Sequence, residues 1–260
     1  MDRFVDQRLK ALQQKLGVKA DGILGPVTLT ALERAVAGTE GTEAHGDFSM
    51  IVSQSGLEQL IRFEISTPQN YHRKLDHPIW PGGGSGITIG VGYDLGFNSP
   101  QQLQRDWSGR LTDHHVKLLR GVTGLRGAEA RAALWRVRNV LVPFDAAQQV
   151  FYTSTLPRYA RLTRRTYPQL HRLPADAQAM LLSLVYNRGS RLSGSRRREM
   201  KAIKDKVVRQ DLPGIADEML AMQRLWNKTE LPGLYRRRGA EADLVRKADR
   251  SYLWPELIYI

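Results

Sequence analysis

The hydrophobic positions at the start of the chain follow the spacing of an α-helix. Apolar side chains recur three or four residues apart between residues 5 and 16, which places them on one helical face. They are Val5, Leu9, Leu12 and Leu16. Gly17 is a typical helix end, the segment 21–26 is rich in turn residues, and a second short helix is predicted over 27–36. We therefore expect a small helical domain over residues 1–37.

A polar segment separates this domain from the rest of the chain. The stretch GTEGTEAHGD at 38–47 is small and polar, which is typical of a flexible linker, and we assign residues 38–49 to it. Over 50–260 we predict one larger domain with a first helix, a Gly-rich strand region at about 78–97 and helices to the end. The expected helices cover 100–107, 112–122, 127–139, 144–154, 156–166, 175–187, 196–208, 212–223 and 235–247.

The Gly-rich segment has the alternation of a β-strand, with one apolar face and one nearly bare face. The apolar face carries Ile87, Ile89, Val91 and Tyr93, and the other carries Thr88, Gly90, Gly92 and Asp94. A straight strand would hold Thr88 and Asp94 roughly 20 Å apart. A turn at 90–92 would instead form a hairpin with Thr88 opposite Asp94 at about 5 Å. We predict the hairpin, with its bare face open to a large ligand.

One carboxylate lies on the apolar face of the first helix of the larger domain. Glu64 follows Leu57 by seven residues, and about 7.2 residues make two helical turns, so both share one face. Burial of a carboxylate favours its protonated form. Glu64 is therefore a candidate general acid. The alternative is a glutamate at a helix end that reaches solvent or pairs with an arginine.

Composition excludes several kinds of chemistry. The absence of cysteine excludes disulfides and thiol chemistry, and the six histidines lack a metal-binding spacing such as HExxH. The Gly-rich segment also lacks the spacing of phosphate-binding loops. We therefore expect no metal and no cofactor. A formal net charge of +13 favours an anionic partner, which charge alone does not identify as wall, membrane or nucleic acid.

The N-terminal motif is similar to the peptidoglycan-binding type 1 domain. The segment LQQKLGVKADGILGPVTLTAL at 12–32 resembles that family's pattern LQ..LG....DG..G..T..AL. Its glycines allow a tight connection between two helices, and Pro26 suits the first position of the second helix. The resemblance implies binding to wall glycan or to the stem peptide.

Three later blocks resemble the phage T4-type lysozymes. The first is the helix ending near Glu64, followed by TIGVG at 88–92. The second is AMLLSLVYNRG at 179–189, similar to that family's S-x-x-FN-x-G. The third joins Trp226 to PGLYRRRGAE at 232–241, similar to W...GL-x-x-RR-x-x-E. This resemblance implies a mainly α (α+β) fold, in which a lysozyme-like domain with a small Gly-rich β-hairpin region accompanies the small helical N-terminal domain.

The chain departs from the T4-type pattern at the second carboxylate. That family places it eight residues after the glutamate, where this chain has Arg73. The order Glu64, Thr88, Asp94 instead resembles pesticin, a muramidase toxin. The resemblance therefore implies that Glu64, Thr88 and Asp94 are catalytic, with Asp76 as a rival for the second carboxylate. The residues expected to bind substrate are Tyr71, Gly90, Gly92, Tyr93 and Asn187.

The implied reaction is hydrolysis of the β-1,4 bond between N-acetylmuramic acid and N-acetylglucosamine. Glu64 would protonate the leaving oxygen, while Asp94 and Thr88 hold water for an inverting attack, which needs carboxyl groups about 6.5–9.5 Å apart. A retaining reaction would need a shorter separation. The competing functions are a lytic transglycosylase, a non-catalytic wall-binding protein and a nucleic-acid-binding protein.

A wall-binding unit joined to a lysozyme-like domain, without a secretion signal, fits a phage endolysin. No apolar run is long enough to predict a transmembrane helix. We expect it to lie in the host cytoplasm before lysis and to act on the periplasmic cell wall. A bacteriocin or secreted effector is the competing role. The expected partners are bacterial peptidoglycan and anionic outer-membrane lipids, with no nucleic acid and a monomeric chain. The basic segment 188–209 would bind the envelope, with Met200, Ile203, Val207 and Val208 facing inward.

Overall fold

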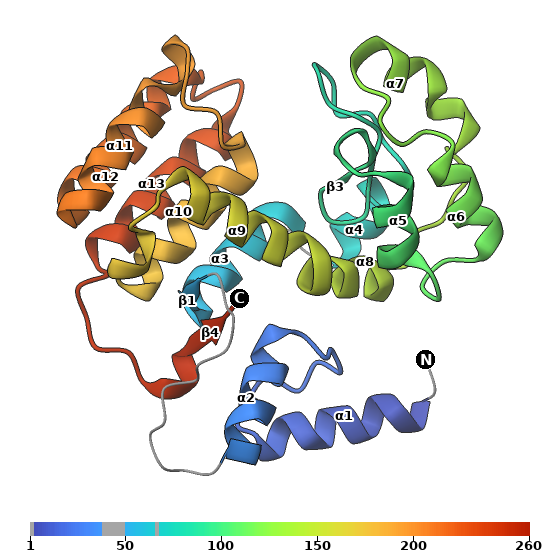
Figure 1. Ribbon diagram of the computed structural model, residues 1–260, viewed down its shortest axis with the longest axis horizontal. Coiled ribbons are helices and arrows are strands. Elements are labelled where there is room, and N and C mark those ends of the chain that lie inside the picture. Colours follow the sequence, from blue (N-terminus) through green and yellow to red (C-terminus); the bar gives the residue numbers. More distant parts are fainter. Residues whose placement is uncertain (1–2, 38–49, 66–67) are drawn as a thin grey trace. The chain divides into compact units, whose positions relative to one another are not determined.

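The computed structural model describes residues 3–37, 50–65 and 68–260. The chain is mainly helical, with four short strands among these residues (Figure 1). It divides into two compact units, one formed by Met1–Phe63 with Pro157–Ile260 and the other by Glu64–Leu156. None of the helices within the described residues is both long and apolar enough to cross a membrane.

Helix α10 (Ala175–Arg188) is the central element of the first unit. Every residue of its segment 175–185 is buried. Strand β1 (Ile51–Ser53) and helix α13 (Pro232–Arg246) pack against it, and helix α12 (Leu212–Ala221) packs on both α13 and α11 (Arg198–Arg209) (Figure 1). Since α10 is buried on all sides, each polar side chain that it carries needs a partner within the protein.

Two strands that are far apart in the sequence pair with each other, and one of them packs on α10. Strand β1 is antiparallel to β4 (Leu257–Tyr259), with Ile51 opposite Tyr259. The buried Ser53 accepts a hydrogen bond from the Gly56 amide at 3.0 Å, which caps helix α3 (Gln54–Ile65). A Cβ at Gly56 would collide with Ala179 of α10. Helix α3 therefore approaches α10 as closely as only glycine allows.

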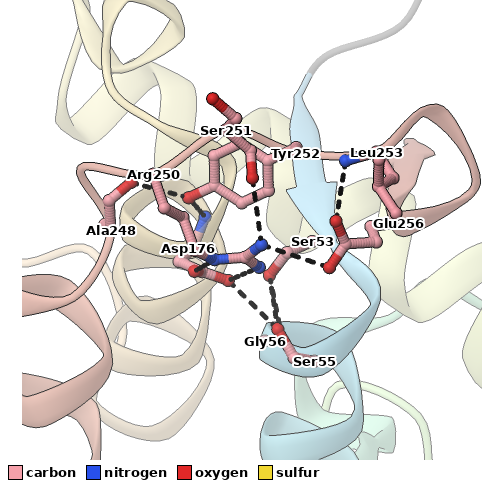
Figure 2. A network of polar contacts seen from close by, with 10 residues as sticks. All are labelled: Ser53, Ser55, Gly56, Asp176, Ala248, Arg250, Ser251, Tyr252, Leu253 and Glu256. Atoms are coloured by element: carbon pink, nitrogen blue, oxygen red, sulfur yellow. Dashed lines mark hydrogen bonds and ion pairs between the residues drawn. The ribbon is translucent and has the colours of Figure 1, made fainter.

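A buried aspartate ties the C-terminal segment to α10 and α3 (Figure 2). The side chain of Asp176 is fully buried, and its Oδ2 accepts from Arg250 Nε at 2.9 Å. Arg250 also donates to Glu256 at 3.1 Å, and Ser55 donates to Asp176 Oδ1 at 3.1 Å. A buried carboxylate is tolerated when it is paired and hydrogen bonded in this way. One carboxylate thus holds together three segments that are distant in sequence.

The second unit contains short helices around the hairpin. Helix α5 (Pro100–Trp107) packs on α6 (Asp113–Arg120) and on α8 (Phe144–Val150), and α8 also packs on α4 (Pro68–Lys74). Thr112 and Ser99 cap α6 and α5 through their side-chain oxygens. The remaining elements are the 3-10 helix η1 (Leu95–Phe97), α7 (Gly127–Ala133), the 3-10 helix η2 (Leu134–Arg136) and the π-helical turn η3 (Phe151–Thr155).

The N-terminal motif is organised around one buried glutamine between α1 (Arg3–Lys15) and α2 (Pro26–Ala37). Gln13 is fully buried, and its Nε2 lies 2.9 Å from three acceptors, which share its two hydrogens: Asp21 Oδ1, the Ile23 carbonyl oxygen and Thr28 Oγ1. Its Oε1 accepts from the Gly22 amide at 2.8 Å. The Gln, Asp-Gly and Thr positions of the motif therefore specify a single polar core beneath the turn.

Most of the predicted helices are confirmed, two of them to the residue. Helices α5 and α9 (Leu156–Thr166) have the expected bounds, and α2 begins at Pro26 as the motif implies. The expectation of helices to the end of the chain is wrong, because β4 is a strand that pairs with β1, and helix α4 was not foreseen. Val208 is also misassigned, since it is 45% exposed while Met200, Ile203 and Val207 are buried. The assigned linker 38–49 lies outside the described residues.

Replacement of Arg250 by methionine should destabilise the first unit by leaving Asp176 buried without its cation. Breaking a buried ion pair costs about 3–5 kcal/mol. We expect roughly 2–3 kcal/mol, because the Arg250 side chain is 33% exposed. The matched control is Arg246→Met, whose partner Asp217 is exposed, and its cost should stay below about 1 kcal/mol. Urea denaturation measures both, and equal effects would contradict a special role for Asp176.

Candidate active site

The predicted hairpin is present and pairs the two expected catalytic residues. Strands β2 (Thr88–Ile89) and β3 (Tyr93–Asp94) are antiparallel, with Thr88 opposite Asp94. Gly90 and Gly92 form the turn with φ of 54° and 64°, a conformation that glycine adopts without strain. The Thr88 amide and carbonyl both bond to Ile79 on the other side of β2. Thr88 and Asp94 therefore form a non-hydrogen-bonded pair, the type whose side chains lie closer together.

Backbone amides fix the orientation of the Asp94 carboxylate. Oδ1 accepts from the Gly96 amide at 2.8 Å, and both oxygens accept from the Gly86 amide at 3.1 Å. A Cβ at Gly86 would collide with Asp94 Oδ1 and with the Gly96 backbone, and one at Gly96 would lie 2.8 Å from Gly86 Cα. The two glycines therefore allow the close approach that holds this half-buried carboxylate.

Glu64 and Asp76 differ in setting. Glu64 lies in the last turn of α3 and is half-buried, whereas Leu57 and Leu60 on the same helix are buried. The side chain of Asp76 is 20% exposed and pairs with Nδ1 of His77 at 2.8 Å. Asp76 thus lies beside a partly exposed imidazole, whereas Asp94 lies within the hairpin opposite Thr88. The hairpin brings together Thr88 and Asp94 and leaves Asp76 outside that pair.

Three of the residues expected to bind substrate are occupied by contacts within the protein. Tyr71 is fully buried and donates to the Val142 carbonyl at 2.9 Å, and burial, with the nearby charges of Asp76 and Asp145, raises its pKa. Tyr93 is buried and donates to Asp106 at 2.7 Å. A Cβ at Gly90 would lie 2.9 Å from that of Ala147. The bare position at Gly90 therefore makes room for helix α8.

Aromatic contacts hold both tyrosines in the core of the second unit. The ring of Tyr93 meets that of Trp107 edge to face at 5.5 Å, and the ring of Tyr71 lies 5.0 Å from Phe144. Such pairs add packing energy to the burial of the rings. In this structure these two tyrosines can position the site, whereas a direct contact with a ligand would need exposed surface. Gly92, by contrast, is half-buried.

The two C-terminal motifs meet in one buried ionic cluster. Glu241 of α13 is fully buried, and its Oε1 accepts from Ser183 of α10 at 2.6 Å, from Arg237 at 3.1 Å and from Arg238 at 2.9 Å. Arg238 also donates to Asn187 Oδ1 at 3.3 Å. The cluster was not predicted from the sequence, although the spacing of Arg237, Arg238 and Glu241 places them on one side of a helix.

Asn187 also lines a cavity of about 320 Å³ at the C-terminal end of α10. Its other lining residues are Arg188, Arg196, Arg197, Trp226 and Leu234. Burial, together with the charges of Arg197, Arg238 and Arg196, lowers the pKa of Arg188 to about 10. The pKa of Arg197 is lowered by burial and by Arg196 and Arg191. This cavity is therefore strongly electropositive.

Neither a group of metal-binding side chains nor similarity to known proteins assigns a function to this chain. Within residues 3–37, 50–65 and 68–260, no group of three or more His, Asp or Glu side chains is arranged to hold a metal ion. No family model matches this chain, and no curated protein matches it. The function proposed for the site therefore depends on the residues that form it.

Replacement of Gly86 by alanine should displace the Asp94 carboxylate from its amide donors. Overpacking of this kind costs about 1–3 kcal/mol. Gly84→Ala is the matched control, because a Cβ there meets nothing within 4 Å, and its effect should stay within about 0.5 kcal/mol. Chemical denaturation measures both variants. If Gly86→Ala is as stable as Gly84→Ala, the close approach at Asp94 is not a constraint on the hairpin.

Proposed function

We propose that this chain is a muramidase with a lysozyme-like domain, which hydrolyses the β-1,4 bond between N-acetylmuramic acid and N-acetylglucosamine in bacterial peptidoglycan. The observation that carries the proposal is the pairing of Thr88 with Asp94 across the Gly-rich hairpin. This is the arrangement that the resemblance to T4-type lysozymes and pesticin implies for a water-holding pair. The general acid would be Glu64, in the last turn of α3.

The proposed reaction divides acid and base roles between two carboxyl groups. Glu64 donates a proton to the glycosidic oxygen as the bond to the anomeric carbon breaks. Asp94 accepts a proton from a water molecule that attacks that carbon from the opposite face, and the hydroxyl of Thr88 helps to hold the water. The amides of Gly86 and Gly96 hold the Asp94 carboxylate in a fixed orientation for this role.

Two further features support action on a bacterial wall. The net charge of +13 suits an anionic polymer, and the N-terminal motif resembles a peptidoglycan-binding domain. In this proposal residues 1–37 hold the enzyme on the wall while the larger domain cleaves the glycan. The biological role would be that of an endolysin, which lyses a host cell from the cytoplasmic side by cutting the periplasmic wall.

Glu64→Gln should abolish glycan cleavage in a protein that still folds, because an amide cannot supply the proton. Loss of general-acid catalysis lowers the rate by at least about 10²–10⁴-fold. Glu58→Gln is the matched control, since Glu58 is an exposed glutamate on the same helix. Turbidity loss of purified peptidoglycan gives the rate, and circular dichroism checks folding. Near-normal lysis by Glu64→Gln would remove Glu64 from the mechanism.

Mass spectrometry of the digestion products tests the reaction itself. Hydrolysis leaves a free reducing muramic acid, whereas a lytic transglycosylase leaves an anhydro sugar. Absence of any cleavage by the unaltered chain would point to a wall-binding protein without activity.

Asp94→Asn should reduce cleavage far more than Asp76→Asn. Asp94 faces Thr88 in the hairpin, while Asp76 pairs with His77 outside it. A group that activates water contributes about 10²–10⁴-fold to the rate, so Asp94→Asn should lose that much and Asp76→Asn little. Initial rates on the same peptidoglycan preparation decide between them. An inactive Asp76→Asn beside a nearly normal Asp94→Asn would reverse the assignment.

A further inference from the structure

The cavity at the end of α10 has the form of a small ligand site. Its volume of about 320 Å³ lies at the lower end of the roughly 300–1,000 Å³ typical of small-molecule sites. Trp226 and Leu234 supply apolar surface on one part of the wall, and the remaining lining is polar or cationic. All six lining residues belong to the first unit of the chain. The cavity therefore lies within one compact unit.

The arginines of this cavity are held by backbone and aromatic contacts. Arg188 donates to the Arg196 carbonyl at 2.6 Å, and its guanidinium lies 5.0 Å from the centre of the Trp226 ring. Arg224 donates to the Ser195 carbonyl at 2.8 Å, which fixes the same loop. Arg197 donates to the sulfur of Met200 at 3.3 Å. These contacts hold the Arg188 and Arg197 side chains without pairing either guanidinium directly with a carboxylate.

The nearby carboxylates are already engaged by other arginines. Glu199 is bound by Arg198 and Arg224, and although burial raises its pKa, the hydrogen bonds from these two arginines outweigh burial and lower it. Glu241 is bound by Arg237 and Arg238. Across the part of the chain that the structure describes, no carboxylate lies within 4.0 Å of the guanidinium groups of Arg188, Arg196 or Arg197. The buried Nε of Arg188 also has no hydrogen-bond acceptor among those residues.

We propose that this cavity binds a phosphate monoester, with Arg188, Arg196 and Arg197 holding the phosphate and Trp226 and Leu234 contacting the group that carries it. Guanidinium groups match phosphate oxygens in fork-like pairs. Three cations without a counter-charge suit a dianion better than the single charge of a carboxylate. The Oδ1 of Asn187 is used by Arg238, so its amide nitrogen is the end that can donate to the ligand.

The lowered pKa of Arg188 agrees with a site that favours an anion. Burial and the charges of Arg197, Arg238 and Arg196 oppose the protonated form, and a bound dianion would relieve both effects. The ligand could be a soluble phosphosugar or a lipid headgroup, which share this chemistry. The inference does not depend on glycosidase activity.

Isothermal titration calorimetry with glucose 6-phosphate tests the proposal, with uncharged glucose as the matched ligand. The test variant is Arg196→Gln with Arg197→Gln, and the control variant is Lys204→Gln with Arg209→Gln. The control removes the same charge from exposed positions on α11 outside the cavity. Thermal unfolding checks that both variants fold. Glucose 6-phosphate should bind the parent and the control, and the test variant should bind it roughly 10- to 100-fold more weakly. Glucose should not bind.

Vesicles separate the two sources of phosphate. If the ligand is a lipid headgroup, vesicles of phosphatidylcholine with phosphatidic acid should bind the control variant and bind the Arg196→Gln, Arg197→Gln variant more weakly. If the ligand is a soluble phosphosugar, the vesicles should bind both variants equally. The proposal is overturned if glucose 6-phosphate does not bind, or if the test and control variants bind it equally. It is also overturned if an acetylated peptide with a free carboxylate binds through these arginines and glucose 6-phosphate does not.

Discussion

The burial of the Glu241 carboxylate is the constraint on which the C-terminal helices depend. A carboxylate that is fully removed from water must be neutralised within the protein. Ser183 of α10 and two arginines of α13 supply the hydrogen bonds to its Oε1. Because these contacts cross from α13 to α10, they fix the two helices against each other. They also bring two separate sequence blocks together at one place in the structure.

The same cluster contributes to the electrostatics at the end of α10. Arg237 and Arg238 both bind Glu241, and Arg238 also donates to Asn187. The charge of Arg238 is one of the causes that lower the pKa of Arg188. The buried cluster therefore adds to the positive charge of the cavity, most of which comes from the arginines that line it.

Polar side chains have the same organising role at two other places. The side-chain amide of Gln13 forms hydrogen bonds that stabilise the turn of the N-terminal motif. The Asp94 carboxylate stabilises the Gly-rich segment by accepting from the amides of Gly86 and Gly96. In both places glycine lets the backbone come within hydrogen-bond distance of a buried or half-buried side chain. The glycines that look like signs of an open ligand face in the sequence are therefore partly explained by close packing.

The sequence by itself determined the local structure. Helical periodicity located most helices, and the paired glycines at 90 and 92 predicted the turn that sets Thr88 opposite Asp94. Helices and turns depend on interactions between residues close in sequence. Hydrophobic periodicity and turn residues therefore predict them. Only the tertiary structure decided that β1 pairs with β4, that Gly90 packs against Ala147, and that Tyr71 and Tyr93 are core residues. The physical reason is that burial and distant pairing depend on which surfaces meet, and a local pattern does not specify its partner.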